Sequence, residues 1–265
     1  MNRVTVVFIL TSLSFFPSSA QILIGPEIGP QVSWVSFEDK ESRSPYRRKP
    51  VVGYHAGVGV SFRVHKRFFL NAAVLYSTKG KSLTGREDQI FRHQARYRYI
   101  DIPMAYTVEF LNKVGKSRQY KWYLGMGPNV SYWISGKGSL ENAQLNENLI
   151  ERLDYKVVFN KERGDFTDNQ MSVADPNRLQ LGLNLSAGFV FEPMGYQKIL
   201  MNIRYEAGHS FYSRESTGLF NLTNEYEDNL RVRNQGFRLT FAYMIDLKTE
   251  ERKKGKSTIK RNKMK

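Results

Sequence analysis

The segment VGYHAGVGVSFR, residues 52–63, has an apolar side chain at every second position and a small or polar one between. Tyr54 and Val58 belong to the apolar set, and His55 and Arg63 to the other. A β-strand turns successive side chains to opposite faces, so one face of this segment is apolar and the other is small and polar. In a soluble sandwich the apolar face would form the core, whereas in a membrane barrel it would face lipid.

The first twenty residues have the organisation of a secretory signal. Arg3 precedes an apolar run, 4–16, which proline and small residues follow as far as Ala20. We therefore predict a signal peptide over 1–20 and a mature chain that starts at Gln21. The run is too short for a spanning helix, and no later stretch reaches the roughly 20 continuous apolar residues that one needs. Membrane residence would therefore require a barrel.

The chain has 265 residues and no cysteine, so as an exported protein it would fold without disulfides. Its length predicts one barrel domain over 21–247, because barrels of this size commonly do not divide. The formal net charge is +15, and residues 248–265, with nine Lys or Arg against two Glu, supply +7 of it. We predict a basic periplasmic tail there. The remaining excess would face anionic lipopolysaccharide or phospholipid headgroups, or serve solubility alone. Export argues against nucleic acid as a partner.

Eight segments follow the same period of two. Each is about 10–15 residues long, which is close to what a tilted strand needs to cross a bilayer. Pro26 and Pro30 predict an edge, a bulge or a late start in the first segment. Phe69 and Leu75 fall on the polar side of the third. The segments are residues 22–37, 52–64, 68–78, 97–110, 120–135, 178–192, 198–212 and 235–247.

The connections between these segments alternate in length. The short ones are 65–67, 111–119 and 193–197, and the long polar ones are 38–51, 79–96, 136–177 and 213–234. Short turns at one rim and long loops at the other are typical of outer-membrane barrels, with the long loops outside the cell. We therefore predict an all-β fold, an eight-stranded antiparallel up-and-down transmembrane β-barrel with a periplasmic C-terminus. The longest loop would hold binding residues, either on a hairpin around 155–159 or on a mobile polar loop.

Three short stretches resemble the PorT-like outer-membrane barrel proteins of Bacteroidetes. They are LYSTKG at 75–80, YIDIP at 99–103 and GMGP at 125–128, and Arg204, Tyr205 and Gly208 fit the same pattern. Their order and spacing match over 52–247. The resemblance implies an outer-membrane barrel of the cell envelope, with a loose link to protein secretion or surface assembly. The last strand, 236–243, is similar to the signal that the barrel-assembly machinery recognises, which implies that machinery as a partner during biogenesis.

The inward-facing positions are rich in charge. An eight-stranded barrel has an interior just wide enough for side chains to fill, so we predict paired charges that plug the lumen. The inward set includes His55, Arg63, Asp101, Glu109, Lys121, Arg204, Glu206 and Arg238. His209 and Ser210 suggest an esterase, but adjacent strand residues point to opposite faces, which argues against a dyad. The other histidines lack metal-ligand spacing, so no catalytic, cofactor or metal residue is predicted.

The sequence therefore predicts a non-catalytic outer-membrane barrel with a structural or binding role through its outer loops. Its expected partners are outer-membrane lipid and lipopolysaccharide, and an envelope protein. Three alternatives stay open: a small-solute pore, an outer-membrane lipid-modifying enzyme that uses His209 and Ser210, and a soluble periplasmic barrel of lipocalin type. The last would have its apolar side chains inside.

Overall fold

The computed structural model describes residues 21–39, 41, 45–86, 90–114, 118–162, 164–194, 197–214, 217–223 and 226–247. The predicted signal peptide, 1–20, and the predicted basic tail, 248–265, lie outside these residues. The described chain is an all-β structure with a short helix, α3 (Ala143–Glu147). Within it, no helix has the length and apolar character needed to cross a membrane.

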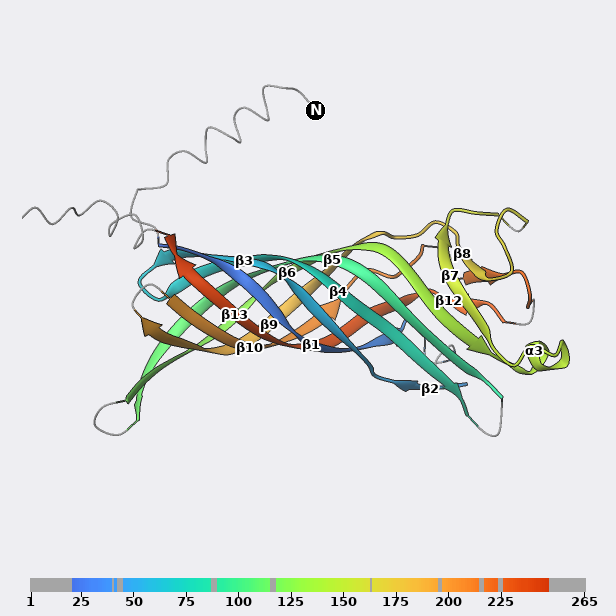
Figure 1. Ribbon diagram of the computed structural model, residues 1–265, viewed down its shortest axis with the longest axis horizontal. Coiled ribbons are helices and arrows are strands. Elements are labelled where there is room, and N and C mark those ends of the chain that lie inside the picture. The colour runs from blue at the N-terminus through green and yellow to red at the C-terminus, as the bar shows by residue number, and fades with distance from the viewer. Residues whose placement is uncertain are drawn as a thin grey trace, which may run out of the picture.

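Eight strands pair into a closed antiparallel ring (Figure 1). Each pairs with the next ring strand along the chain, and β1 closes the ring on β13, with Ile24 opposite Ile245. This confirms the predicted eight-stranded up-and-down barrel. The ring strands are β1 (Ile22–Phe37), β3 (Val51–His65), β4 (Phe68–Gly85), β5 (Arg92–Val114), β6 (Arg118–Glu141), β9 (Leu179–Met194), β10 (Gln197–Gly208) and β13 (Val232–Asp246).

The outward face of the ring is apolar across the middle of the barrel. Leu183 is 59% exposed, whereas its neighbour Asn184 is 1% exposed. Tyr54, Val58 and Phe241 also point outward and are exposed. The apolar side chains lie outside and the polar ones inside, as a bilayer-embedded barrel requires and opposite to a lipocalin-type barrel. We call the following outward side chains the apolar band: Ile28, Tyr54, Val58, Val74, Ile102, Met126, Tyr132, Leu183, Ile203 and Phe241.

Several strands are longer than the sequence pattern predicts. β4 continues to Gly85 and β5 begins at Arg92, so most of the predicted loop 79–96 is strand. Beyond the band the pattern inverts, because Gln94 and Arg96 are exposed while Ala95 and Tyr97 are buried inside. An outward face that meets water instead of lipid selects polar residues, so a search for outward apolar positions stops at the band.

Other boundaries also differ from the prediction. β1 is continuous from Ile22, and Pro26 and Pro30 point outward within it, so they neither break nor delay the strand. The seventh ring strand, β10, ends at Gly208, four residues before the predicted end at Tyr212. The phase of the third ring strand is as predicted, since Phe69 and Leu75 are buried inside.

The predicted loops 136–177 and 213–234 are largely folded. After β6, the chain forms α3 and then β7 (Leu153–Phe159), which pairs antiparallel with the end of β6. β8 (Gln170–Val173) pairs parallel with β7, and β11 (Thr217–Phe220) joins β8 to β12 (Asp228–Asn229). A further short strand, β2 (Tyr46–Lys49), pairs with the end of β4.

We call α3, β7, β8, β11 and β12 the cap. Figure 1 shows that the cap elements gather at one end of the barrel, which we call the long-loop end. The opposite end, where β3 turns into β4, is the short-turn end. Of the two alternatives for 155–159, the paired strand is therefore the observed one.

Candidate functional site

A four-residue ion network lies at the centre of the barrel. Lys79 Nζ lies 3.1 Å from Asp101 Oδ1 and 2.5 Å from Glu206 Oε1, and Arg238 Nη2 lies 2.5 Å from Glu206 Oε2. Arg238 also pairs with Asp101. All four side chains are nearly fully buried, and they come from β4, β5, β10 and β13. Two cations and two anions balance, so the charges that burial would otherwise penalise are paired.

Polar neighbours complete the central network. Ser77 donates to Asp101 at 2.5 Å, and Lys79 donates to Ser131 at 3.2 Å. Asn129 donates to Glu206 at 3.1 Å. Hydrogen bonds of this kind to ionised groups restrain the charged side chains of the network, which lies across the lumen.

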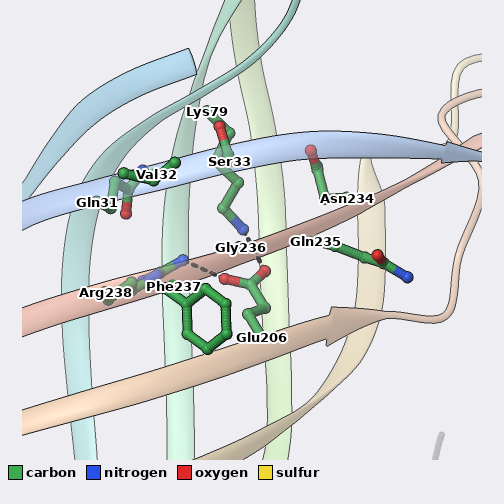
Figure 2. Close-up of a pocket in the computed structure, with 10 residues that line it drawn as sticks. All are labelled: Gln31, Val32, Ser33, Lys79, Glu206, Asn234, Gln235, Gly236, Phe237 and Arg238. Carbon is green, nitrogen blue, oxygen red and sulfur yellow. Dashed lines mark hydrogen bonds and ion pairs between the residues drawn. The ribbon is translucent and has the colours of Figure 1, made fainter. Parts of the chain in front are cut away.

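A very small space lies beside the network. Figure 2 shows it next to Lys79, Glu206 and Arg238, with Gln31 and Phe237 among its lining residues. Its volume is about 10 Å³, which is close to the minimum for one water molecule. A void of this size does not form a solute path through the barrel centre.

A second set of ion pairs lies toward the short-turn end. Glu192 accepts from Lys121 at 2.7 Å and from Lys198 at 3.1 Å. Lys198 Nζ also lies 5.2 Å from the centroid of the Phe69 ring, which points inward. Arg63 covers the same ring at 5.3 Å. Cation–π contacts of this length are attractive, so Phe69 fills the lumen between the two cations.

The long-loop end is filled by an apolar core that barrel and cap share. Trp133 of β6 is fully buried, with its ring centroid 5.1 Å from Tyr97 and 4.9 Å from Phe159. Tyr212 packs on the same indole at 5.5 Å. Aromatic rings bury large areas and prefer such tilted and edge-on contacts. The core therefore ties the cap to the barrel wall. Its other buried members include Leu140, Leu145, Leu153, Val157, Met171, Val173, Phe220 and Leu230.

A buried polar cluster lies within this apolar core. Lys81 pairs with Asp228, and both side chains are fully buried. His93 hydrogen-bonds through Nε2 to the Tyr155 hydroxyl at 2.5 Å and through Nδ1 to the Tyr226 hydroxyl at 2.9 Å. The cluster links β4 and β5 of the ring to β7 and β12 of the cap.

Burial in the cap changes the acidity of its tyrosines. Desolvation, together with the nearby Asp228 carboxylate, raises the pKa of Tyr155 and of Tyr226 well above the usual tyrosine value. Both hydroxyls therefore stay protonated in neutral solution and act as hydrogen-bonding groups rather than as bases. Beside the adjoining ends of β1 and β13, the hydrogen bond from Arg231 lowers the pKa of Glu38.

The predicted inward set agrees with the structure except at its edges. His55, Asp101, Arg204, Glu206 and Arg238 are buried inside. Glu109 and Lys121 are half-buried near the short-turn end, and Arg63 is exposed there. The sequence interpretation missed Lys79, Lys81 and Asp228, because all three lay in segments predicted as loops. It also did not name Glu192 and Lys198, although both lay at the ends of predicted strands.

His209 and Ser210 lie after the end of β10 at Gly208, so the predicted argument from opposite strand faces does not apply to them. His209 is exposed, and the Ser210 hydroxyl accepts a hydrogen bond from the Leu181 backbone N–H at 2.9 Å. In the described ranges no group of three His, Asp or Glu side chains could hold a metal ion.

Comparisons with known proteins give the following matches. The family model described as outer membrane protein beta-barrel domain matches residues 16–209. Neisserial surface protein A is 10% identical, with a TM-score of 0.37 over 87% of this chain and 100% of that chain. OprG from Pseudomonas aeruginosa is 10% identical, with a TM-score of 0.41 over 86% and 93%. Ail of Yersinia pestis, solved with the heparin analogue sucrose octasulfate, is 11% identical, with a TM-score of 0.35 over 85% and 99%. Comparison with curated protein sequences gives no match.

Proposed function

The chain belongs to the outer membrane protein β-barrel domain family, and from this premise we propose that it is a non-catalytic, non-conducting barrel that presents its cap as a rigid binding surface. The long-loop end then lies outside the cell, and both termini lie in the periplasm. This orientation is supported by the alternation of short turns at one end with long connections at the other.

The observation that supports this function best is the filling of the lumen at three levels. Lys121, Glu192 and Lys198 pair near the short-turn end. The network around Arg238 crosses the centre, and the aromatic core around Trp133 fills the long-loop end. A solute would have to separate buried ion pairs and open an aromatic core, both of which carry large free-energy costs.

The cap is the surface that a partner would meet. It is built of paired strands and an apolar core rather than of mobile loops, so a partner would bind a surface that is already ordered. The resemblance to PorT-like proteins supports an envelope partner linked to secretion or surface assembly. The barrel-assembly machinery would act on the chain during biogenesis.

Conductance across a planar bilayer tests the proposal. Purified, heat-modifiable protein inserted into the bilayer is expected to give no current steps above the lipid baseline at about ±100 mV. The Arg238→Ser variant, which removes one of the two cations of the central network, shows whether the assay detects a partly opened lumen. Regular current steps from the unmodified protein would contradict the proposal and favour the small-solute pore.

A further inference from the structure

Three cations lie side by side on the outer face of the barrel at the long-loop end. Arg96 of β5 is opposite Lys137 of β6, which in turn is opposite Lys156 of β7. All three side chains are exposed. Neighbouring strands lie about 4.8 Å apart, so the row extends roughly 10 Å across the surface. Arg98, two residues nearer the apolar band on β5, is exposed on the same face.

The row is not neutralised by the protein. Among the residues that the structure describes, no carboxylate lies within ion-pair distance of Arg96, Lys137 or Lys156. The nearby Asp154 pairs with Arg152 at 2.9 Å. Like charges directly opposite each other on adjacent strands destabilise a sheet. The row of three cations therefore costs folding free energy in the protein alone, and a bound anion that lies across the row would remove this repulsion.

The same residues line a groove of about 550 Å³. Its walls contain Arg96, Lys137, Arg152 and Lys156, with Asp154 as the one acidic member of the lining. Gln94 and Asn169 supply uncharged hydrogen-bonding groups. Three cations without a carboxylate partner, beside amide side chains, are the chemistry that binds phosphorylated sugars, which need both charge neutralisation and hydrogen bonds to hydroxyls.

The position of the groove along the barrel axis, relative to the apolar band, indicates where such a ligand would come from. Ile100 of β5 pairs with Tyr132 of the apolar band, and Arg96 lies four residues farther along the strand. Four residues span about 13 Å, or about 10 Å along the barrel axis for a strand tilted by roughly 40°. The row therefore lies in the layer immediately above the hydrocarbon, at the depth of lipid headgroups.

We propose that this groove binds the phosphorylated sugars of lipopolysaccharide in the surrounding outer leaflet. The inference rests on the proposed orientation, which places the long-loop end in the leaflet that contains lipopolysaccharide. Arg96, Lys137 and Lys156 contact the phosphate groups, and Gln94 contacts sugar hydroxyls. The barrel is thereby held at a fixed depth and rotation relative to its lipid neighbours.

Two matched double variants test the site. Lys137→Gln/Lys156→Gln removes two charges from the row, and Lys66→Gln/Arg67→Gln removes two exposed charges at the short-turn end. Affinity is measured by thermophoresis of the full-length protein in detergent with rough lipopolysaccharide that retains its lipid A phosphates. The first variant is expected to bind about 30-fold more weakly than the unmodified protein, and the second within about twofold of it. Lys137→Arg/Lys156→Arg is expected to retain the affinity.

Two further probes identify the ligand source. Dephosphorylated lipopolysaccharide is expected to bind the unmodified protein as weakly as the Gln variant binds the native lipid, and inositol hexakisphosphate is expected to bind more weakly than the lipid. Equal weakening in both double variants, or no effect of dephosphorylation, would overturn the site. Binding of inositol hexakisphosphate as tight as that of the lipid would overturn the lipid assignment. Each variant is first shown by heat modifiability to have an intact barrel. Failure of the lipopolysaccharide site would therefore not affect the conductance test of the proposed function, and the two proposals can fail separately.

Discussion

At the scale of single residues, the barrel interior depends on charges that are stable only together. Arg238 pairs with both Asp101 and Glu206, and Lys79 pairs with the same two carboxylates. Each side chain is nearly fully buried, so none can recover hydration if its partner is lost. We therefore expect the network to contribute to the uniqueness of the packed interior more than to its net stability.

Removal of the shared cation is expected to be costly. Arg238→Met leaves two buried carboxylates with Lys79 as their one remaining cation, so we expect the free energy of unfolding to fall by about 3–5 kcal/mol. Urea unfolding in lipid vesicles, followed by tryptophan fluorescence, measures the change. Arg67→Met, at an exposed position in the turn between β3 and β4, is the control and should change it by less than about 0.5 kcal/mol. A loss below about 1 kcal/mol for Arg238→Met would show that the network is not coupled as described.

The cap tyrosines predict a response to alkaline pH. Because the pKa of Tyr155 and Tyr226 is raised in the folded protein, these hydroxyls ionise in the unfolded chain first, and stability falls as pH rises above about 10. Tyr226→Phe should therefore leave the ultraviolet phenolate signal of the folded protein unchanged between about pH 9 and 11. The variant should reduce only the later increase in phenolate absorbance, which accompanies unfolding at higher pH. A smaller signal below about pH 11 would mean that Tyr226 is accessible to solvent.

At the scale of strands and connections, the sequence predicts what lies within the bilayer much better than what lies beyond it. All eight ring strands lie at segments in which outward apolar side chains alternate with inward polar ones. The segment 178–192, for example, corresponds to β9. Beyond the band, inward residues such as Tyr97 and Leu140 are apolar and outward ones polar. The period is unchanged but its sign reverses, so segments such as 79–96 resembled polar loops. The cap strands are two to seven residues long, and β7, the longest, is the one whose alternation shows in the sequence, at 155–159.

The same limit applies to the interior site. His55, Asp101, Glu206 and Arg238 could be assigned to the lumen because each lies within a clear alternation. Lys79 could not, since it follows the last outward apolar residue of its segment. Its pairing with Asp101 depends on the register between β4 and β5. That register places Lys79 opposite Tyr97, which is four residues before Asp101 on the same inward face of β5. Register of this kind is not visible in one sequence.

The attachment of the cap to the barrel should depend on one indole. Trp133→Ala removes the ring against which Tyr97, Phe159 and Tyr212 pack. We expect local opening of the cap, seen as tryptic cleavage after residues such as Lys161 that is about tenfold faster or more, while the barrel stays heat-modifiable. Trp122→Ala, which removes an indole stacked on Phe110 near the short-turn end, is the control and should leave cleavage of the cap unchanged. Equal cleavage in both variants would contradict a cap core centred on Trp133.

At the scale of the whole molecule, the side chains of the barrel lie in three environments: hydrocarbon, water and the lumen. Hydrocarbon surrounds the apolar band, water surrounds the cap, and ion pairs and aromatic rings occupy the lumen at the levels described above. This division explains why the outward side chains of one strand are apolar within the band and polar beyond it. In the orientation that we propose, the basic groove of β5, β6 and β7 lies at the boundary between the hydrocarbon and water environments.

The central claim is that the apolar band meets hydrocarbon, and spin labels can test it directly because the chain has no cysteine of its own. Single cysteines are introduced at Leu183, in the band, and at Leu149, which is 94% exposed beside α3 of the cap. Each variant is labelled, reconstituted into vesicles and measured by power-saturation EPR with oxygen and with a water-soluble nickel complex. The label at 183 is expected to be relaxed by oxygen and shielded from nickel, and the label at 149 to show the reverse. Strong nickel relaxation at 183 would place that face in water and contradict the membrane barrel.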